Sequence, residues 1–552
     1  MVRTRALHRA VRAGADDPWV TAGDLFGSRT MGVDSVGLKV VRARFAQSFK
    51  PADNPPIVVL VGKVLRKLGS IRSPQDVAVV VRWVVRGTGN VTRRTRRRLQ
   101  RRRDARRSAR LEHVAMSVPG WVGVVGDPGV LPGARVWGPK ADGVEVVVAS
   151  ADVAEADLPV AGLSERDVPV VRLGAVSGIS EAAPVNPRRF NPAGFLPVGT
   201  GTVVEPPPAL SWPEDRVRSA RAALATRFER VDDLRSAARV LELTASGVVV
   251  VLVDGGGADR WLGGRLAGLV GNVDEARLAD PTYREAASVA QRRATHVDHA
   301  LPARLRRIRQ VAGLPVQSAP MVSVVAATNR PDMLERMVAN VVMQDYPNLE
   351  LVLALHGDGF SADDPVAPEG LSLSVLRFGD DAVFGHVLGG ASAAASGEWV
   401  TKMDDDDWYG VEHVSDLVLA AGYSGADLVG KGSEFVYLEG SGVTIRRGLG
   451  AGEASSRTLS GGTLLVRSSV LRDIDGWRGL PRGVDVALID DVVSAGGVIW
   501  RTHPFGYLLR RTTGRHTWTV DDAYFLRQAE QRWEGLALNV AGVCEVGGPP
   551  AD

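Results

Sequence analysis

The chain has 552 residues, of which 24% are charged and 45% hydrophobic, and its formal net charge is +4. This length suits about three domains, and the composition is that of a soluble globular protein. A single cysteine, Cys544, excludes a disulfide framework and a cysteine metal cluster.

The N-terminus predicts no export signal. The first twenty residues carry four arginines but no apolar core. No run in the chain approaches the ~20 apolar residues that a membrane span needs. We therefore expect a cytoplasmic protein, peripheral at most at the inner face of the cell membrane.

Residues 1–112 are expected to be mainly helical and to end in an arginine-rich segment, Arg93–Arg110. This segment holds eleven arginines against Asp104 alone, a local charge of +10, so the rest of the chain carries about −6 (4 − 10). It is either an exposed basic helix or linker, or a surface that attracts anionic lipid headgroups. We expect no nucleic-acid partner, because no aromatic residues interleave the arginines for base stacking.

Residues 113–303 are predicted to form an α/β domain. Strands are expected at 120–125, 144–149, 168–172 and 247–254, and helices at 216–230, 231–242 and 284–303. Gly255-Gly256-Gly257 follows the last strand and could cradle a phosphate. The spacing is not GxGxxG, however, and Asp254 would repel an anion. The sequence leaves three roles open for this domain: a second transferase domain, an acceptor-binding domain or an assembly module.

Residues 304–319 are interpreted as a linker, and a new pattern fills residues 320–552. Met321–Ala327 predicts a strand, Asp332–Met343 a helix with a helical apolar period, and Leu349–Leu355 a second strand. A further strand-like segment, Gly397–Thr401, leads into four consecutive aspartates. This alternation predicts a doubly wound sheet, in which ligands bind at the carboxyl ends of the strands.

The four aspartates, Asp404–Asp407, are called the acid block. Four like charges repel, so each must be solvated or paired. A divalent cation would relieve the repulsion, and Mg²⁺ and Mn²⁺ are usually held by one or two carboxylates plus substrate phosphates. The acid block is therefore either a metal–diphosphate site or a solvated acidic turn that caps a helix starting near Tyr409.

Four motifs, taken in order, resemble family 2 of the nucleotide-diphospho-sugar glycosyltransferases, which have the single-Rossmann fold called GT-A. The motifs are SVVAATNRP at Ser323–Pro331, QDYPNLE at Gln344–Glu350, the acid block, and GGTLLVRSSVL at Gly461–Leu471 with Gly476-Trp477 behind it. The resemblance covers about residues 320–515 and implies a mixed, mostly parallel sheet. Residues 113–303 weakly resemble the nucleotide-side half of two-lobed glycosyltransferases, so we interpret them as a degenerate Rossmann-like domain.

The resemblance implies roles for the matching residues. Asp404 and Asp406 would hold a divalent metal, Mn²⁺ or Mg²⁺, together with the donor diphosphate, and the metal would act as a Lewis acid on the leaving group. Thr328, Asn329 and Arg330, at the end of the first strand, would contact the nucleotide-sugar donor, as would Asp405.

The family's general base is expected at Asp485, which stands eleven residues before Gly496, the family's spacing. A carboxylate there would take the proton of the acceptor hydroxyl. The alternative is that Asp485 only caps the helix Val486–Ala495. Asp490 and Asp491 are the other candidates for the base.

Family members can also use a late histidine as a metal ligand and basic residues to hold the diphosphate. His516 is preferred over His503 for the first role, and Arg510 and Arg511 are expected in the second. The sequence also departs from the family at two places. His356-Gly357-Asp358-Gly359 replaces an Asp-Asp-Gly-Ser turn, so that Asp358 would substitute for the acid that holds the nucleotide base, and Val484 replaces the glutamate before the catalytic aspartate.

The resemblance thus implies an inverting, metal-dependent glycosyltransferase that moves a sugar to the hydroxyl of a glycan or lipid-linked acceptor. The basic segment suggests cell-envelope or extracellular polysaccharide synthesis at the membrane. One alternative is a non-catalytic nucleotide-sugar-binding scaffold, against which the intact acid block together with Asp485 argues. Another is a nucleotidyltransferase, which would want a glycine-rich basic phosphate loop that Ala326–Pro331 does not provide.

Overall fold

The computed structural model describes most of the chain from residue 121 onward. The described ranges are 121–125, 134–135, 146–149, 170–172, 179–192 without 181, 183 and 189, 203–204, 223–316, 318–361, 365–450, 452–512 and 521–543. The segment Arg93–Arg110, the helices expected in residues 1–112, Arg515 and His516 lie outside these ranges. Within them, no helix has the length and apolar character to cross a membrane.

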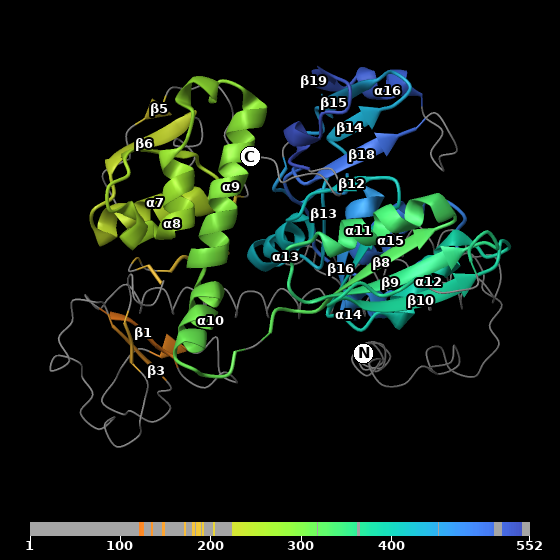
Figure 1. Ribbon diagram of the computed structural model, residues 1–552, viewed down its shortest axis with the longest axis horizontal. Helices are drawn as coiled ribbons and strands as arrows, with labels where there is room; N and C mark the ends of the chain where they lie inside the picture. Colours follow the sequence, from red (N-terminus) through yellow and green to blue (C-terminus); the bar gives the residue numbers. More distant parts are fainter. Residues whose placement is uncertain are drawn as a thin grey trace, which may run out of the picture. The chain divides into compact units, whose positions relative to one another are not determined.

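Two small sheets form the upstream α/β region (Figure 1). The first has the order β2-β1-β3-β4, with β1 Trp121–Val125, β2 Ala134–Arg135, β3 Val146–Ala149 and β4 Val170–Arg172. The second is parallel in the order β5-β6-β7, with β5 Val203–Val204, β6 Ala225–Arg230 and β7 Val250–Asp254. The strands expected at 120–125, 144–149, 168–172 and 247–254 are confirmed, with shorter bounds.

The described residues of this region include the α-helices α7 Leu234–Ala245, α8 Ala258–Gly271, α9 Pro281–His299 and α10 Leu301–Val311, with a 3-10 turn η3 at Glu275–Arg277. Helix α7 begins where Asp233 accepts a hydrogen bond from the Ser236 backbone, a capping box. Helix α9 begins at Pro281, behind the capping Asp280. The core of the region forms where α7, α8 and α9 cover strands β6 and β7.

Two expectations for this region are wrong. Residues 225–230 form strand β6 instead of the end of a helix, because Thr226 and Phe228 are buried and the segment pairs in parallel with β7. Tertiary pairing here overrides the local helical preference. The segment 304–319, interpreted as a linker, is helical at its start, since α10 continues to Val311.

A seven-stranded mixed sheet forms the centre of the downstream part, in the order β10-β9-β8-β11-β16-β13-β17. Its strands are β8 Val322–Thr328, β9 Leu349–His356, β10 Ser372–Phe378, β11 Trp399–Met403, β13 Leu428–Gly430, β16 Leu465–Arg467 and β17 Ile499–Arg501. Only β16 runs antiparallel to its neighbours in this sheet. The predicted mixed, mostly parallel sheet is therefore confirmed.

Helices cover both faces of this sheet, because alternate residues of each strand point to opposite sides. Val325 of β8 packs with α12 (Phe384–Ala394), α14 (Ser468–Asp473) and α15 (Val484–Ser494). Its neighbours Val324 and Ala326 pack on the other face with α11 (Leu334–Val342), which follows the 3-10 turn η4 (Pro331–Met333). Helix α13 (His413–Ser424) covers Val322 on that same side.

A second, five-stranded sheet begins directly after the acid block. Its order is β12-β18-β14-β15-β19, with β12 Trp408–Tyr409, β14 Phe435–Leu438, β15 Val443–Arg447, β18 Tyr507–Arg511 and β19 Ala529–Glu534. The short elements η5 (Gly461–Thr463), α16 (Asp522–Leu526) and η6 (Leu538–Ala541) complete this part. The helix expected near Tyr409 is displaced, since residues 408–409 form a strand and α13 starts only at His413.

The order of the central strands places the acid block. From β8 the chain crosses to β9 and β10 on one side, then returns to pair β11 on the other side of β8. Met403 lies opposite Ala326, so the residues that follow β8 and β11 leave the same edge of the sheet. Such a topological switch point is where open α/β sheets bind ligands.

Candidate active site

Lys402, in strand β11, is buried and faces two carboxylates. Its Nζ lies 2.5 Å from Asp404 Oδ1 and 3.7 Å from Asp485 Oδ1. Burial, with the nearby charges of Asp485 and Asp406, outweighs Lys402 and raises the pKa of Asp404 to about 6. Because one ammonium serves two carboxylates, this corner of the site keeps an excess of negative charge.

The next two acids pair with the end of strand β8. Arg330 donates to both oxygens of Asp405, and its Nη2 lies 2.9 Å from Asp406 Oδ2. Thr328 Oγ1 donates to Asp405 Oδ2 at 2.5 Å. The sequence-predicted donor residues Thr328 and Arg330 therefore meet the acid block directly, whereas Asn329 between them is exposed.

The fourth acid, Asp407, is a structural member of the block. It is 1% exposed and accepts hydrogen bonds from the Tyr507 hydroxyl at 2.7 Å and the Arg510 backbone N–H at 3.0 Å. Arg336 Nη2 donates to its carbonyl oxygen at 2.9 Å and stacks over Trp408. Burial, together with Asp406 and Asp404, raises the pKa of Asp407 well above its usual value.

Asp485 lies across a glycine pair from Asp404. A β-carbon on Gly461 would stand 2.1 Å from Asp485 Oδ2, and one on Gly462 would stand 2.7 Å from Asp404 Oδ2. Only residues without a side chain fit between these two carboxylates. Asp485 Oδ1 is buried without a hydrogen-bond partner, although the side chain as a whole is 30% exposed. The Lys402 ammonium, 3.7 Å away, is its nearby counter-charge.

The other candidates for the base are engaged elsewhere. Asp490 pairs with Arg457 at 3.3 Å, and Asp491 pairs with Arg478 at 2.8 Å. Asp485 is also in the first turn of α15, as a cap would be, but its carboxylate faces Lys402 and the glycine pair. These contacts favour Asp485 as the base over Asp490 and Asp491.

The carboxylates present fit a divalent cation. No group of three or more His, Cys, Asp or Glu side chains within the described ranges is arranged to hold a metal alone. Asp404 and Asp406, with side chains 33% and 16% exposed, can together provide the one or two carboxylates that Mg²⁺ or Mn²⁺ uses when a diphosphate completes its shell. Burial first, and then the charges of Asp485 and Asp406, raise the pKa of Asp404, and a bound cation would favour its ionised form.

The remaining sequence-predicted residues have the following surroundings. Asp358 is exposed in the turn after β9. Arg510 joins the acid block through its backbone, while its Nη2 donates to Glu439 at 2.8 Å. The Arg511 guanidinium stacks on Phe525, 5.4 Å from the ring centre. His503 is buried, and its Nε2 lies 3.2 Å from Asp416 Oδ2 on α13, so its ring is engaged in the fold.

Sequence reasoning missed Lys402 and Tyr409. The Tyr409 hydroxyl accepts from the Asp404 backbone N–H at 2.7 Å and donates to the Gly462 carbonyl at 3.0 Å, which joins the acid block to the glycine pair. A signal for Lys402 was present, since a lysine inside a strand that is otherwise apolar needs a carboxylate partner.

The described geometry agrees with a comparison against protein families. The model of the family described as Glycosyl transferase family 2 matches residues 323–448, which include β8, the acid block and β15. None of the curated proteins matches the chain in sequence.

Solved structures resemble part of the chain. A mannosyltransferase from Pyrobaculum calidifontis, in complex with GDP-Man and Mn²⁺, is 16% identical, with 37% of this chain and 61% of that one covered and a TM-score of 0.26. Residues 1–349 of S. aureus TarS, in complex with UDP-GlcNAc, are 19% identical, with 38% and 64% covered and a TM-score of 0.29. The chain thus spans less than two thirds of the length of either neighbour, and TM-scores this low carry no argument about chemistry. The match of the family model to residues 323–448, which include Thr328, Arg330 and the acid block, supports a family 2 glycosyltransferase domain in the downstream part of this chain.

Proposed function

We propose that this protein transfers a sugar from a nucleotide-diphosphate donor to an acceptor hydroxyl with inversion at the anomeric carbon. The observation that carries the proposal is that two carboxylates in different environments lie on either side of Gly461-Gly462. Asp404 sits beside Lys402 at the donor side, and Asp485 presents an oxygen without a hydrogen-bond partner. Two carboxylates held apart in this way suit a donor anchor and a general base.

The chain's residues have separable tasks in the transfer. Asp485 accepts the proton of the acceptor hydroxyl as the hydroxyl oxygen bonds to the anomeric carbon. The bond from that carbon to the phosphate oxygen breaks in the same step, and the nucleoside diphosphate leaves. Thr328 and Arg330 hold Asp405, and Arg330 also holds Asp406, so that the acid block keeps its shape while the leaving group forms.

Asp404 and Asp406 would hold a divalent metal, which would supply Lewis-acid stabilisation of the charge on the leaving diphosphate. Arg510 and Arg511 are the last two residues of β18. In the same strand, Leu508 pairs with Trp408, the residue that follows the acid block. We propose the two arginines as diphosphate contacts. Asn329 and Asp358, exposed at the ends of β8 and β9, are proposed to meet the nucleoside.

A nucleotide-sugar-binding scaffold without turnover is the second candidate. It is favoured by the ion pairs of the site, since Lys402 and Arg330 already neutralise part of the acid block without a metal ion. The two candidates differ at Asp485: turnover requires its carboxylate, whereas binding alone is indifferent to Asp485→Asn.

The cellular setting remains a proposal from charge. The basic segment Arg93–Arg110 would hold the protein at an anionic membrane surface, where each basic residue adds roughly 1 kcal/mol. A glycan or lipid-linked acceptor in envelope or extracellular polysaccharide synthesis fits that location.

The test is release of nucleoside diphosphate from a panel of UDP-, GDP- and dTDP-sugars, with Mn²⁺, Mg²⁺ or EDTA, in the presence of candidate acceptors. The proposal expects metal-dependent release from one donor class, abolished in Asp404→Ala/Asp406→Ala. Release of equal size in EDTA or in the double variant would contradict it.

A further inference from the structure

Helix α9 of the upstream region is buried on two faces. On one face, Gln291 bonds to both backbone groups of Val250 in β7, at 2.9 and 2.8 Å, and Ser288 Oγ donates to the Gly247 carbonyl at 2.6 Å. Thr295 and Thr244 of α7 share a hydrogen bond of 2.7 Å. This face secures α9 in its own α/β layer.

A second face of α9 contacts the glycosyltransferase domain, and Arg292, one turn after Ser288, lies where the two faces meet. Arg292 Nη2 lies 2.6 Å from Glu453 Oε1, and the two side chains are 3% and 0% exposed. Glu453 also accepts from the Tyr423 hydroxyl at 2.8 Å and Trp500 Nε1 at 3.0 Å. The acceptor capacity of Glu453 is therefore shared between α9 and the transferase core.

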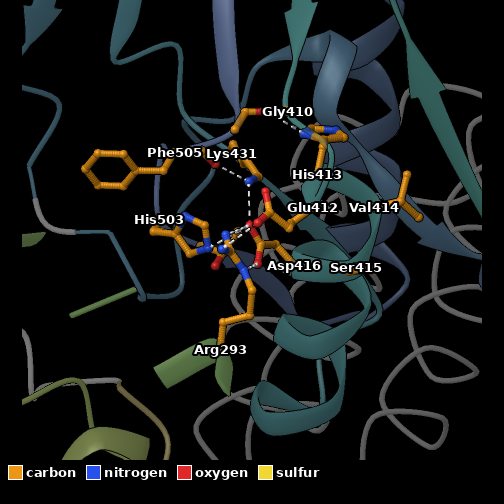
Figure 2. Close-up of polar contacts among 12 residues, drawn as sticks. Arg293, Gly410, Glu412, His413, Val414, Ser415, Asp416, Lys431, His503 and Phe505 are labelled. Carbon is orange, nitrogen blue, oxygen red and sulfur yellow. Dashed lines mark hydrogen bonds and ion pairs between the residues drawn. The ribbon is translucent and has the colours of Figure 1, made fainter. Parts of the chain in front are cut away.

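Arg293, the next residue, is part of a second buried cluster (Figure 2). Its Nε and Nη2 donate to the two oxygens of Asp416 at 2.8 and 2.9 Å, and its Nη1 donates to Glu412 at 3.1 Å. Lys431 and His503 reach the same Asp416 carboxylate from the transferase side, each at 3.2 Å. A bidentate arginine pair in a buried setting is strong and geometrically specific.

Apolar and polar contacts continue along the same face towards the start of the helix. Val289, 3% exposed, belongs to one apolar cluster with Trp408, Phe435 and Phe505. Thr282 and Glu285 lie one to two turns before Val289 in α9. Arg446 of β15 donates from Nη1 to Thr282 Oγ1 at 2.7 Å and also pairs with Glu285. The spacing 282, 285, 289, 292, 293 follows one side of a helix.

We propose that α9 packs as part of the core of the transferase domain. The upstream α/β region is then an obligate structural partner of this domain, and it does not move independently on a flexible linker. A helix that is buried on two faces belongs to a core, and a helix at a transient domain contact would expose one side. Removing Arg292 would leave the buried Glu453 carboxylate without its arginine partner. Removing Arg293 would take the bidentate partner from Asp416, which keeps Lys431 and His503. Among the three roles that the sequence leaves open for the upstream domain, this contact supports the assembly module.

The contact also reaches the proposed site. Trp408, which packs with Val289, directly follows Asp407 of the acid block, and Arg336 stacks over its ring. Helix α9 therefore reaches the acid block through the apolar cluster that Val289 shares with Trp408.

The test cuts the chain between the two parts. A protease recognition sequence is inserted after the exposed Val316, the full-length chain is cleaved there, and the fragments are sized by gel filtration at about 1 µM, where contacts of millimolar affinity have dissociated. We expect the two fragments to elute together. We expect Arg292→Met/Arg293→Met to release them, while the matched control Arg235→Met/Arg307→Met, at exposed positions of α7 and α10, does not.

Two results would overturn the proposal: separation of the unmutated fragments, or continued association of the Arg292→Met/Arg293→Met fragments. If that variant does not fold, hydrogen exchange on the unmutated chain decides instead. Amides of α9 should then exchange as slowly as those of β14 and β18, and exchange more than tenfold faster would refute an obligate structural partner. Neither readout depends on transferase activity, so the outcome is separate from the test of the proposed function.

Discussion

Lys402 holds a buried positive charge between Asp404 and Asp485, the two carboxylates to which the proposed chemistry assigns different tasks. Removal of this charge would leave the carboxylates facing each other across a glycine pair. Mutual repulsion then has to be relieved by protonation, by separation or by a bound cation.

Lys402→Met is therefore expected to destabilise the metal-free protein by about 1–3 kcal/mol, below the usual 3–5 for a broken buried pair because both carboxylates are partly exposed. Thermal unfolding with and without Mn²⁺ measures this effect. Mn²⁺ should restore more of the melting temperature in the variant than in the wild type. Equal Mn²⁺ shifts in both proteins would show that Lys402 does not serve as a counter-charge.

Asp485→Asn should lower transfer to the acceptor by about 10²–10⁴, the usual contribution of a positioned general base. Donor binding should stay unchanged, because the variant keeps the shape of the side chain. Steady-state transfer rates and calorimetric donor affinity separate the two effects. The matched control is Asp490→Asn, on the same helix but paired with Arg457 at the surface, and a loss of similar size in the control would remove Asp485 from its proposed role.

The raised pKa of Asp404, about 6, predicts a pH dependence of metal and donor binding. A carboxylate must be ionised to bind a cation, so affinity should be constant above pH 6 and fall by about tenfold per unit below it. Calorimetric titration of Mn²⁺ with nucleoside diphosphate from pH 7.5 to 5 tests this. An affinity that stays level to pH 5 would argue against Asp404 as a ligand.

At the scale of the element, apolar periodicity predicted those strands and helices whose formation depends on their own local sequence. The strands β8, β9 and β11 and the helices α11 and α15 were expected from apolar periods, and they occur within a few residues of the predicted ranges. Residues 225–230 were missed because their pairing partner, β7, lies some twenty residues further along the chain. Trp408-Tyr409 was missed for the same reason, since its partner is Leu508-Tyr507.

The site was predictable only in part. Strand ends and the acid block define the edge at which Thr328, Arg330 and Asp404–Asp406 meet, and this follows from topology. The ion pairs Lys402–Asp404 and Arg330–Asp405 depend on side-chain directions that spacing does not give. The late histidine preferred as a metal ligand, His516, lies outside the described residues, and the ring of the less favoured His503 contacts Asp416 in a buried cluster.

This cluster joins α9 and α13 to the residues that follow β13 and β17, and it predicts acid sensitivity of the fold. Burial, more than the nearby Lys431, lowers the pKa of His503 to about 4, against an ordinary 6.5 in the unfolded chain. The unfolded state therefore binds the proton first as pH falls, and stability should decrease between pH 6.5 and about 4 by up to about 1.4 kcal/mol per unit from this group.

Denaturant unfolding of the wild type and His503→Gln at pH 7.5, 6 and 5 tests this contribution. The variant should be less stable at pH 7.5 but lose less stability on acidification. Parallel stability–pH curves for the two proteins would show that His503 does not carry the effect.

At the scale of the whole molecule, the described part of the chain combines a family 2 glycosyltransferase domain with an upstream α/β region that contacts it through α9. We propose that in this domain Asp404 and Asp406 bind a nucleoside diphosphate through a divalent metal, and that Asp485 acts after binding.

Calorimetric titration of UDP, GDP and dTDP into the full-length chain, with Mn²⁺ or with EDTA, tests this binding. We expect that one nucleoside diphosphate binds, that EDTA and Asp404→Ala/Asp406→Ala abolish the binding, and that Asp485→Asn leaves it unchanged. Absence of metal-dependent binding for every nucleotide, or undiminished binding in the double variant, would contradict the proposed role and leave the acid block as an ion-paired turn.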